Sequence, residues 1–380
     1  MQIKTLDVSL LEPAGSSPFA AGELSPSISV IMPNYNHGKW LARALDALVA
    51  QTGPSMEIIV IDDGSTDNSV EVITEFCKRH DCVRLIRHDV NRKIFAAMRT
   101  GIAVARGEFV LFAAADDFVL PGLLARAEAA LRMYPNAAFY CAEAALVDRA
   151  GHVVGYRPIV PPRFTSGYVS PIDVRREILR SDNWFIGPSV IYRRRLLAEI
   201  GYFDESLGTL CDALAQRLLA FRHGFYFDAD TLVVWMVDAA SLSAQTSLSV
   251  GEGRRVIEQG ALWIALHFPP DIRDCYRKLF ERRLRFNMAR HHVVWRSGAP
   301  DTNGISDLLE LSPRERLLLG LIGRVPFMGP LLLLVFTTLR MRPVSLVALL
   351  KSWWRVRVVQ RRERAALEGS LAQACVRGVV

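Results

Sequence analysis

Several features that mark common classes of protein are missing from this sequence of 380 residues. Its six cysteines are scattered and form no C-x-x-C pair, so they predict neither a zinc site nor a disulfide framework. Its eight histidines have no acidic or thiol partners at metal-ligand spacing. The first 27 residues hold no unbroken apolar run of the length that a signal peptide needs. We therefore expect the chain to fold in the reducing cytoplasm.

A net positive charge is also absent from most of the chain. Residues 311–380 carry twelve Lys and Arg against three Asp and Glu, a net charge of +9, whereas the whole chain carries +7. Residues 1–310 therefore carry about −2. They lack the overall basic charge that often marks nucleic-acid-binding proteins, and we expect no nucleic-acid partner.

Short apolar runs alternate with segments of helical spacing from residue 27 to residue 240. This alternation predicts the α/β class, with a mostly parallel, doubly wound sheet flanked by helices. The predicted strands cover residues 27–32, 57–61, 83–86, 108–112, 137–154 with a turn at 148–151, 188–192 and 225–236. The predicted helices start near residues 40 and 70 and cover residues 99–105, 121–134, 195–200 and 212–222.

Ligands of such a sheet bind in the crevice at the carboxyl ends of the strands. Three loops that follow predicted strands hold unusual residues, at 33–37, 62–67 and 113–117, and we expect them to carry the chemistry. No G-x-G-x-x-G turn follows the first strand, where Pro33 and Tyr35 stand instead. This difference argues against a nicotinamide-dependent oxidoreductase.

Five motifs follow one another between residues 27 and 240. They are ISVIMPNYNHGKWLARALDALVAQ, EIIVIDDGSTDNS, NRKIFAAMRTGIAVARG, FVLFAAADDF and PSVIYRRRLLAEIGYFDESLGTLCDALAQR. In this order they resemble the family 2 glycosyltransferases, whose fold is of the GT-A type. The resemblance implies an inverting transfer of a sugar from a nucleotide diphosphate-sugar, expected to be a UDP-sugar, to a hydroxyl of a saccharide or lipid-linked acceptor. It also implies a role in the assembly of cell-surface polysaccharide or glycolipid.

The resemblance assigns six residues to the donor nucleotide-sugar: Pro33, Tyr35, Asp62, Asp63, Arg99 and Asp116. Carboxylates at Asp62 and Asp63 can accept hydrogen bonds from a base N–H and from ribose hydroxyls. The alternative for this Asp-Asp-Gly-Ser segment is a turn that caps the next helix. Arg99 and Met98 stand where the family often has an asparagine and an arginine, so the positive charge is displaced by one residue.

Asp116 and Asp117 follow a buried apolar strand, where adjacent carboxylates repel unless a cation or hydrogen bonds compensate them. The resemblance implies that this pair holds a Mg²⁺ or Mn²⁺ ion that bridges to the donor diphosphate. Ala114 replaces an aspartate that is common in the family, so one expected carboxylate is missing. The alternative is an acidic pair at the N-terminus of the next helix, stabilised by the helix dipole.

Asp212 is the predicted catalytic base, because it resembles the aspartate of a Glu-Asp pair in the family. Its carboxylate would deprotonate the acceptor hydroxyl. Cys211 takes the place of the glutamate, and the alternative for Asp212 is an ordinary helix N-cap. Trp184 is a candidate for stacking on an acceptor sugar, with core packing as its alternative.

Further departures from the family's pattern leave a second function open. The late arginine and histidine of the family are replaced near Met236 and Asp238. Together with Ala114 and Cys211, these replacements are compatible with a non-catalytic nucleotide-sugar-binding protein on the same fold.

The composition predicts four parts: a loose leader at 1–26, the α/β domain at 27–240, a helical extension packed on it at 241–310, and a basic amphipathic segment at 311–380. The last segment has an apolar stretch interrupted by Arg324 and two prolines, which does not suit a simple spanning helix. Apolar helices edged by arginine and tryptophan predict peripheral contact with the inner face of the cell membrane. The alternative is a helical pair packed on the domain or on a second subunit.

Overall fold

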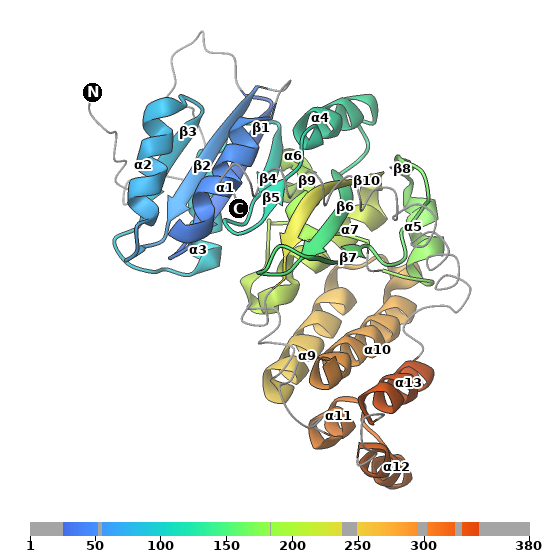
Figure 1. Ribbon diagram of the computed structural model, residues 1–380. Helices are drawn as coiled ribbons and strands as arrows, with labels where there is room; N and C mark the ends of the chain where they lie inside the picture. Colours follow the sequence, from blue (N-terminus) through green and yellow to red (C-terminus); the bar gives the residue numbers. More distant parts are fainter. Residues whose placement is uncertain are drawn as a thin grey trace.

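The computed structural model describes residues 26–51, 55–182, 184–237, 249–294, 302–323 and 329–341. A mixed sheet with helices on both faces forms the larger part, and further helices follow it toward the C-terminus (Figure 1). Residues 1–25 of the predicted leader and the basic segment beyond residue 341 lie outside the described residues. The predicted boundaries at 240 and 310 stay predictions.

Ten strands form the sheet, and eight of them lie side by side in the order β3-β2-β1-β4-β9-β6-β10-β5. They are β1 (Ile28–Asn34), β2 (Met56–Asp62), β3 (Val83–Arg87), β4 (Phe109–Phe112), β5 (Phe118–Val119), β6 (Phe139–Val147), β9 (Ile191–Arg193) and β10 (Phe225–Met236), with β7 (Val153–Arg157) paired to β6 and β8 (Gly167–Val169) paired to β10. The part from β3 to β4 is parallel. The pair β6 and β10 is parallel as well, whereas β5, β7, β8 and β9 run antiparallel to their neighbours, so the sheet is mixed and the predicted parallel pairing holds for β1–β4 and for β6 with β10.

β1 is apolar at consecutive positions because its two faces are both covered. Val30 faces the cluster formed with α1 (Gly38–Val49), whereas Ile31 faces the cluster formed with α3 (Ile94–Val104). α3 approaches β1 so closely that a Cβ at Gly101 would lie 2.3 Å from Cγ2 of Ile31. Only glycine allows this approach.

The other helices of the α/β part are α2 (Ser69–Arg79), α4 (Leu123–Met133), α5 (Pro171–Ile178), α6 (Arg194–Glu199) and α7 (Cys211–His223), with the 3-10 turns η2 (Gly187–Ser189) and η3 (Glu205–Leu210). The prediction of β10 is confirmed at both ends. The strand predicted at 188–192 is wrong in its first part, because η2 occupies those residues and the strand begins at Ile191.

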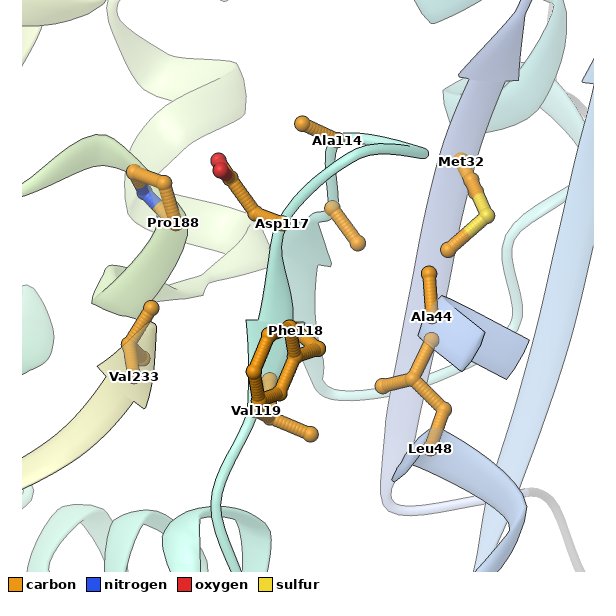
Figure 2. A pocket seen from close by; sticks show the side chains of 10 residues that line it. Met32, Ala44, Leu48, Ala114, Asp117, Phe118, Val119, Pro188 and Val233 are labelled. Atoms are coloured by element: carbon orange, nitrogen blue, oxygen red, sulfur yellow. The ribbon is translucent and has the colours of Figure 1, made fainter. Parts of the chain in front are cut away.

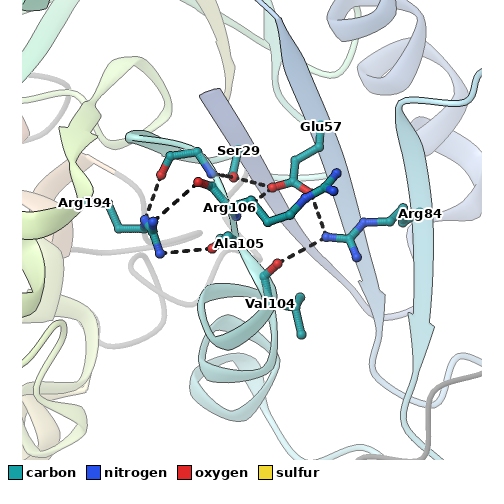
Figure 3. Close-up of polar contacts among 8 residues, drawn as sticks. Ser29, Glu57, Arg84, Val104, Ala105, Arg106 and Arg194 are labelled. Carbon is teal, nitrogen blue, oxygen red and sulfur yellow. Dashed lines mark hydrogen bonds and ion pairs between the residues drawn. The ribbon is translucent and has the colours of Figure 1, made fainter. Parts of the chain in front are cut away.

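A buried carboxylate ties together the amino ends of the first strands (Figure 3). Glu57 accepts hydrogen bonds from Ser29 Oγ (2.7 Å), Arg84 Nη2 (2.6 Å) and Arg106 N (2.8 Å). Arg194 donates to three carbonyls of the segment between α3 and β4. These bonds fix that segment at the edge opposite the predicted site.

The helices α9 (Val250–His267) and α10 (Pro270–Val294) pack against α7, in one apolar cluster with it. Asp182 also links α7 to α10 through hydrogen bonds. Its main-chain oxygen accepts from Arg217 Nη2 of α7 (2.8 Å), and its Oδ2 accepts from Tyr276 Oη of α10 (2.9 Å).

The last described helices are α11 (Thr302–Leu308), α12 (Pro313–Gly323) and α13 (Gly329–Met341), which share a smaller apolar cluster. Within the described ranges, no helix combines the length and the apolar character that crossing a membrane requires.

Candidate active site

The loops after β1 and β2 are joined at one edge of the sheet. The parallel register sets Asn34 beside Asp62, so the segments that follow the two strands start together. Asn34 Nδ2 donates to Asp62 Oδ1 (3.0 Å), and Thr66 N donates to Asn36 Oδ1 (2.8 Å). These bonds give the predicted donor loops a fixed shape.

Asp62 is fully buried and serves the loop itself. While Oδ1 accepts from Asn34, Oδ2 accepts from Ser65 N (3.1 Å). Asp62 therefore shapes a turn, as in the alternative for this segment, but it does not cap α2, whose N-cap is Asn68. The assignment of Asp62 to the nucleotide stays a prediction.

Asp63 is also buried but is held on one oxygen. His88 Nδ1 (2.6 Å) and Arg92 N (2.9 Å) both donate to Oδ1. His88 is fixed in turn by a contact of 3.0 Å between its Nε2 and Thr100 Oγ1. Since neither bond involves Oδ2, this oxygen is the one that can accept a hydrogen bond from a bound ligand.

Tyr35 stands at the same edge and is 41% exposed, while Pro33 is half-buried in β1. The next residue, Asn36, has a positive φ of 57°, and its bond to Thr66 fixes the loop in this conformation. An exposed aromatic ring on a fixed loop is suited to stack on a base.

The acidic loop after β4 uses its two carboxylates differently. Asp117 is buried, and its Oδ1 accepts from Met236 N of β10 (2.8 Å). Burial first, and then the charge of Asp116, raise the pKa of Asp117 well above its ordinary value. Asp116 is half-buried, and its Oδ2 lies 3.5 Å from Arg149 Nη2. Figure 2 shows Asp117 at a small pocket between Pro188 and the exposed Ala114.

Asp212 lies in the first turn of α7, where Oδ1 accepts from Ala213 N (2.7 Å). A Cβ at Gly187 would be 3.3 Å from Asp212 Oδ2, so the carboxylate lies directly against η2. Pro188 of the same turn lines the pocket of Asp117. The predicted base and the acidic loop therefore flank one short turn. Burial raises the pKa of Asp212, although the Ala213 N–H and the Arg217 charge oppose this shift.

The residues of the acidic loop do not fit a preformed site for Mg²⁺ or Mn²⁺. Such ions take oxygen ligands, commonly one or two carboxylates together with substrate phosphates. Ala114 offers no ligand, one oxygen of Asp117 is taken by Met236 N, and Asp116 is paired with Arg149. In the part of the chain that the structure describes, no group of three His, Cys, Asp or Glu side chains could hold a metal ion.

Two predicted residues lie away from these carboxylates. Arg99 forms an ion pair with Glu205 of η3, and it lines a second pocket with Phe95 and Phe112. Trp184 is only 1% exposed and contacts other aromatic rings of the core. Core packing, the alternative for Trp184, is what the structure shows, and this buried ring offers no face to a sugar.

Sequence reasoning did not single out His88 or Arg149. His88 directly follows β3, so its position after a parallel strand was the available signal. Arg149 stands in the turn between β6 and β7, and nothing in the sequence pairs it with Asp116, which is 33 positions away.

Known proteins resemble parts of this chain. The sequence profile of a family described as Glycosyl transferase family 2 matches residues 29–201. YibD of Escherichia coli (strain K12), described as an uncharacterized glycosyltransferase, is 44% identical over 94 residues, which are 25% of this chain and 27% of that protein. The glycosyltransferase GlyG of Streptococcus pneumoniae serotype 4 is 37% identical over 101 residues, 27% of this chain and 34% of that protein. The chain thus matches only about a third or less of these relatives' own length.

Solved structures show the same fold over more of the chain. S. aureus TarS (residues 1–349), solved with UDP, has a TM-score of 0.52 and 18% identity, covering 87% of this chain and 91% of that one. The mannosyltransferase PcManGT from Pyrobaculum calidifontis, solved with GDP-Man and Mn²⁺, has a TM-score of 0.52 and 17% identity, covering 87% of this chain and 88% of that one. Residues 29–201 therefore match glycosyl transferase family 2, and the chain has a fold of the GT-A type.

Proposed function

We propose that this chain is an inverting glycosyltransferase that moves a sugar from a UDP-sugar to a hydroxyl of a saccharide or lipid-linked acceptor. The observation that carries the proposal is the position of Asp212 at the start of α7. Its carboxylate lies against Gly187 of η2, while Pro188 of that turn lines the pocket of Asp117 (Figure 2). The proposed base and the proposed donor loop thus border the same short turn, which would hold both close to one bound substrate.

Asp212 is the proposed general base. A base is most effective when its pKa lies near the operating pH, and burial moves the pKa of Asp212 upward toward that range. In the proposed step, the carboxylate takes the proton of the acceptor hydroxyl as its oxygen bonds to the anomeric carbon. The bond from that carbon to the diphosphate breaks on the opposite face, so the configuration inverts.

The nucleotide is proposed to bind at the loops after β1 and β2. Asp63 Oδ2 would accept a hydrogen bond from the nucleobase, because His88 and Arg92 already hold Oδ1. The exposed ring of Tyr35 would stack on the base. We choose UDP because TarS has been solved with UDP and with UDP-GlcNAc, although PcManGT was solved with GDP-Man.

The acceptor is proposed to be presented at the inner face of the cell membrane, in the assembly of a surface polysaccharide or glycolipid. Apolar side chains are exposed on the last two described helices: Leu317, Leu318 and Leu321 of α12, and Leu331, Val335 and Leu339 of α13. Arg340 of α13 bonds Glu315 of α12 (2.8 Å), which joins the two helices. Exposed leucines beside arginines suit peripheral contact with an anionic bilayer.

A second candidate is a protein that binds nucleotide-sugars without transferring them. The observation that favours it is the loss of two side chains near the site, since Ala114 and Cys211 provide no carboxylate. Binding of UDP-sugars without any release of UDP would support this candidate.

Calorimetric titration with UDP and GDP, followed by assays of UDP release from UDP-GlcNAc and UDP-glucose, tests the proposed function. Asp212→Asn should keep UDP affinity and lose about 100-fold or more in turnover, because an amide cannot take the proton. Asp46→Asn, an exposed aspartate of α1, is the matched control and should behave like the wild type. Equal turnover in the wild type and Asp212→Asn would refute the role of Asp212, and absence of nucleotide binding would refute the function.

A further inference from the structure

Three cationic side chains gather around one ring beside the acidic loop. The ring is that of Trp40 in α1. Lys39 Nζ lies 4.6 Å, Arg149 Cζ 4.8 Å and Arg43 Cζ 5.6 Å from its centroid. Cations are attracted to the face of an indole, which also restricts their orientation.

Two of these cations also contact Asp116. Arg43 Nη2 donates to the main-chain oxygen of Asp116 (3.2 Å), and Arg43 stacks over Phe118 at 4.4 Å. Arg149 reaches the Asp116 carboxylate from the turn between β6 and β7, with Nη2 3.5 Å from Oδ2. The side chain of Arg149 is 35% exposed, so a ligand at this loop can reach it.

The loop thus carries fixed positive charge where the family's pattern implies a divalent ion. A diphosphate leaving group needs positive charge beside it as its bond to the sugar breaks. Ala114, Asp117 and Asp116 do not form a metal site. Ala114 has no ligand atom, Asp117 is bonded to Met236 N, and Asp116 is paired with Arg149. A guanidinium can supply the same charge, and its planar fork fits two phosphate oxygens at once.

We propose that Arg149, supported by Arg43, binds the donor diphosphate in this chain in place of a divalent metal ion. The inference rests on the proposed transfer from a nucleotide-sugar. Without donor, Asp116 and Trp40 hold the guanidinium of Arg149 at the loop. When the donor binds, Arg149 exchanges its bond to Asp116 for bonds to the diphosphate.

The test is calorimetric titration of UDP and UMP into the purified full chain, in EDTA and in Mn²⁺. The wild type should bind UDP with affinities within about twofold in the two buffers. In EDTA, Arg149→Gln should weaken UDP binding by about tenfold or more, because a charge-assisted hydrogen bond is lost, and should weaken UMP binding less. The UDP affinity of Arg149→Lys should fall between those of the wild type and Arg149→Gln, since lysine keeps the charge and lacks the planar guanidinium fork.

Two further variants sharpen the result. Arg277→Gln is the matched control, because Arg277 has a similar exposure and forms its ion pair with Glu281 within α10. It should bind UDP like the wild type. Asp116→Asn should tighten UDP binding in EDTA by up to about fivefold, because the Asp116 carboxylate no longer competes with the diphosphate for Arg149 and a surface ion pair is weak. Thermal unfolding of each variant shows whether it is folded.

The outcomes separate this inference from the proposed function. Mn²⁺ could instead strengthen UDP binding tenfold or more, and Asp116→Asn could abolish that binding. This result would overturn the proposed role of Arg149 and leave the transferase proposal standing. Equal UDP affinity of the wild type and folded Arg149→Gln would overturn it as well. If neither UDP nor GDP binds in either buffer, the proposed function fails and the inference fails with it.

Discussion

The buried imidazole of His88 donates a hydrogen bond of 2.6 Å from Nδ1 to Oδ1 of Asp63, although 25 positions separate the two residues along the chain. The bond joins the end of β3 to the end of β2, and it engages Oδ1 of Asp63 and not Oδ2. His88 is therefore the residue that sets the orientation of the proposed base-binding carboxylate.

His88→Leu should weaken UDP binding by about tenfold and lower the free energy of unfolding by about 2 kcal/mol, because a buried carboxylate loses a charge-assisted partner. His88→Asn should recover part of both, since its amide can donate to Asp63. Calorimetric titration and urea unfolding measure the two effects. His152→Leu, at an exposed histidine, is the control. An unchanged UDP affinity in His88→Leu would separate Asp63 from the donor.

The pH dependence of turnover should report Asp212. A general base acts only when ionised, so kcat/KM should fall as the pH is lowered through its pKa. Burial raises that pKa, so the fall should occur at higher pH than for an ordinary aspartate at about 3.9.

The charge of Arg217 lowers the pKa of Asp212, so Arg217→Gln should move this acid limb to still higher pH. UDP release from UDP-GlcNAc across a pH series provides the profile, with thermal unfolding as a check on folding. A rate that stays constant down to about pH 4 would argue against Asp212 as the base.

The carboxylate of Glu57 should contribute to stability and not to donor binding. It accepts from Arg84 and Arg106 in a buried position far from the loops after the strands (Figure 3). Glu57→Gln should lower the free energy of unfolding by about 2 kcal/mol or more in urea titrations. Glu71→Gln, at an exposed site of α2, should change it little. A selective loss of UDP affinity at unchanged stability would contradict this assignment.

The exposed leucines of α12 should matter for membrane contact. Leu317→Asp combined with Leu321→Asp should reduce sedimentation with anionic phosphatidylglycerol vesicles by more than about tenfold, because each buried leucine contributes about 2 kcal/mol. Leu262→Asp on α9 replaces a leucine of similar exposure and should sediment like the wild type.

High salt should weaken the vesicle binding if the neighbouring arginines take part. A dimer that the double substitution dissociates, without any vesicle binding by the wild type, would instead favour the alternative of a second subunit.

Much of the fold could be predicted because its signals are local. β1 and β2 are largely apolar runs, β10 is apolar on both sides of an Asp-Ala-Asp-Thr segment, and the loops that follow β1 and β2 meet because parallel neighbours end at one edge. The 3-10 turn at Pro188 was missed because an apolar run with a proline has the same local pattern in a strand.

The roles of individual site residues depend on partners distant in sequence. Asp62 and Asp63 are identical neighbours, yet one shapes the turn and the other is held by His88. The pairing of Asp116 with Arg149 depends on where the hairpin of β6 and β7 folds back. Trp184 could not be distinguished from a surface ring without its contacts in the core.

The bonds around Glu57 hold the amino ends of the strands, whereas Asp63 and Asp116 lie beyond their carboxyl ends. The bonds that stabilise the first strands and the proposed site therefore lie at opposite edges of one sheet. Replacements such as Ala114 leave the bonds that secure the first strands intact. In proteins that share this scaffold, substitutions at one edge can therefore change the cation or the acceptor that the enzyme uses, while the bonds at the other edge still allow the protein to fold.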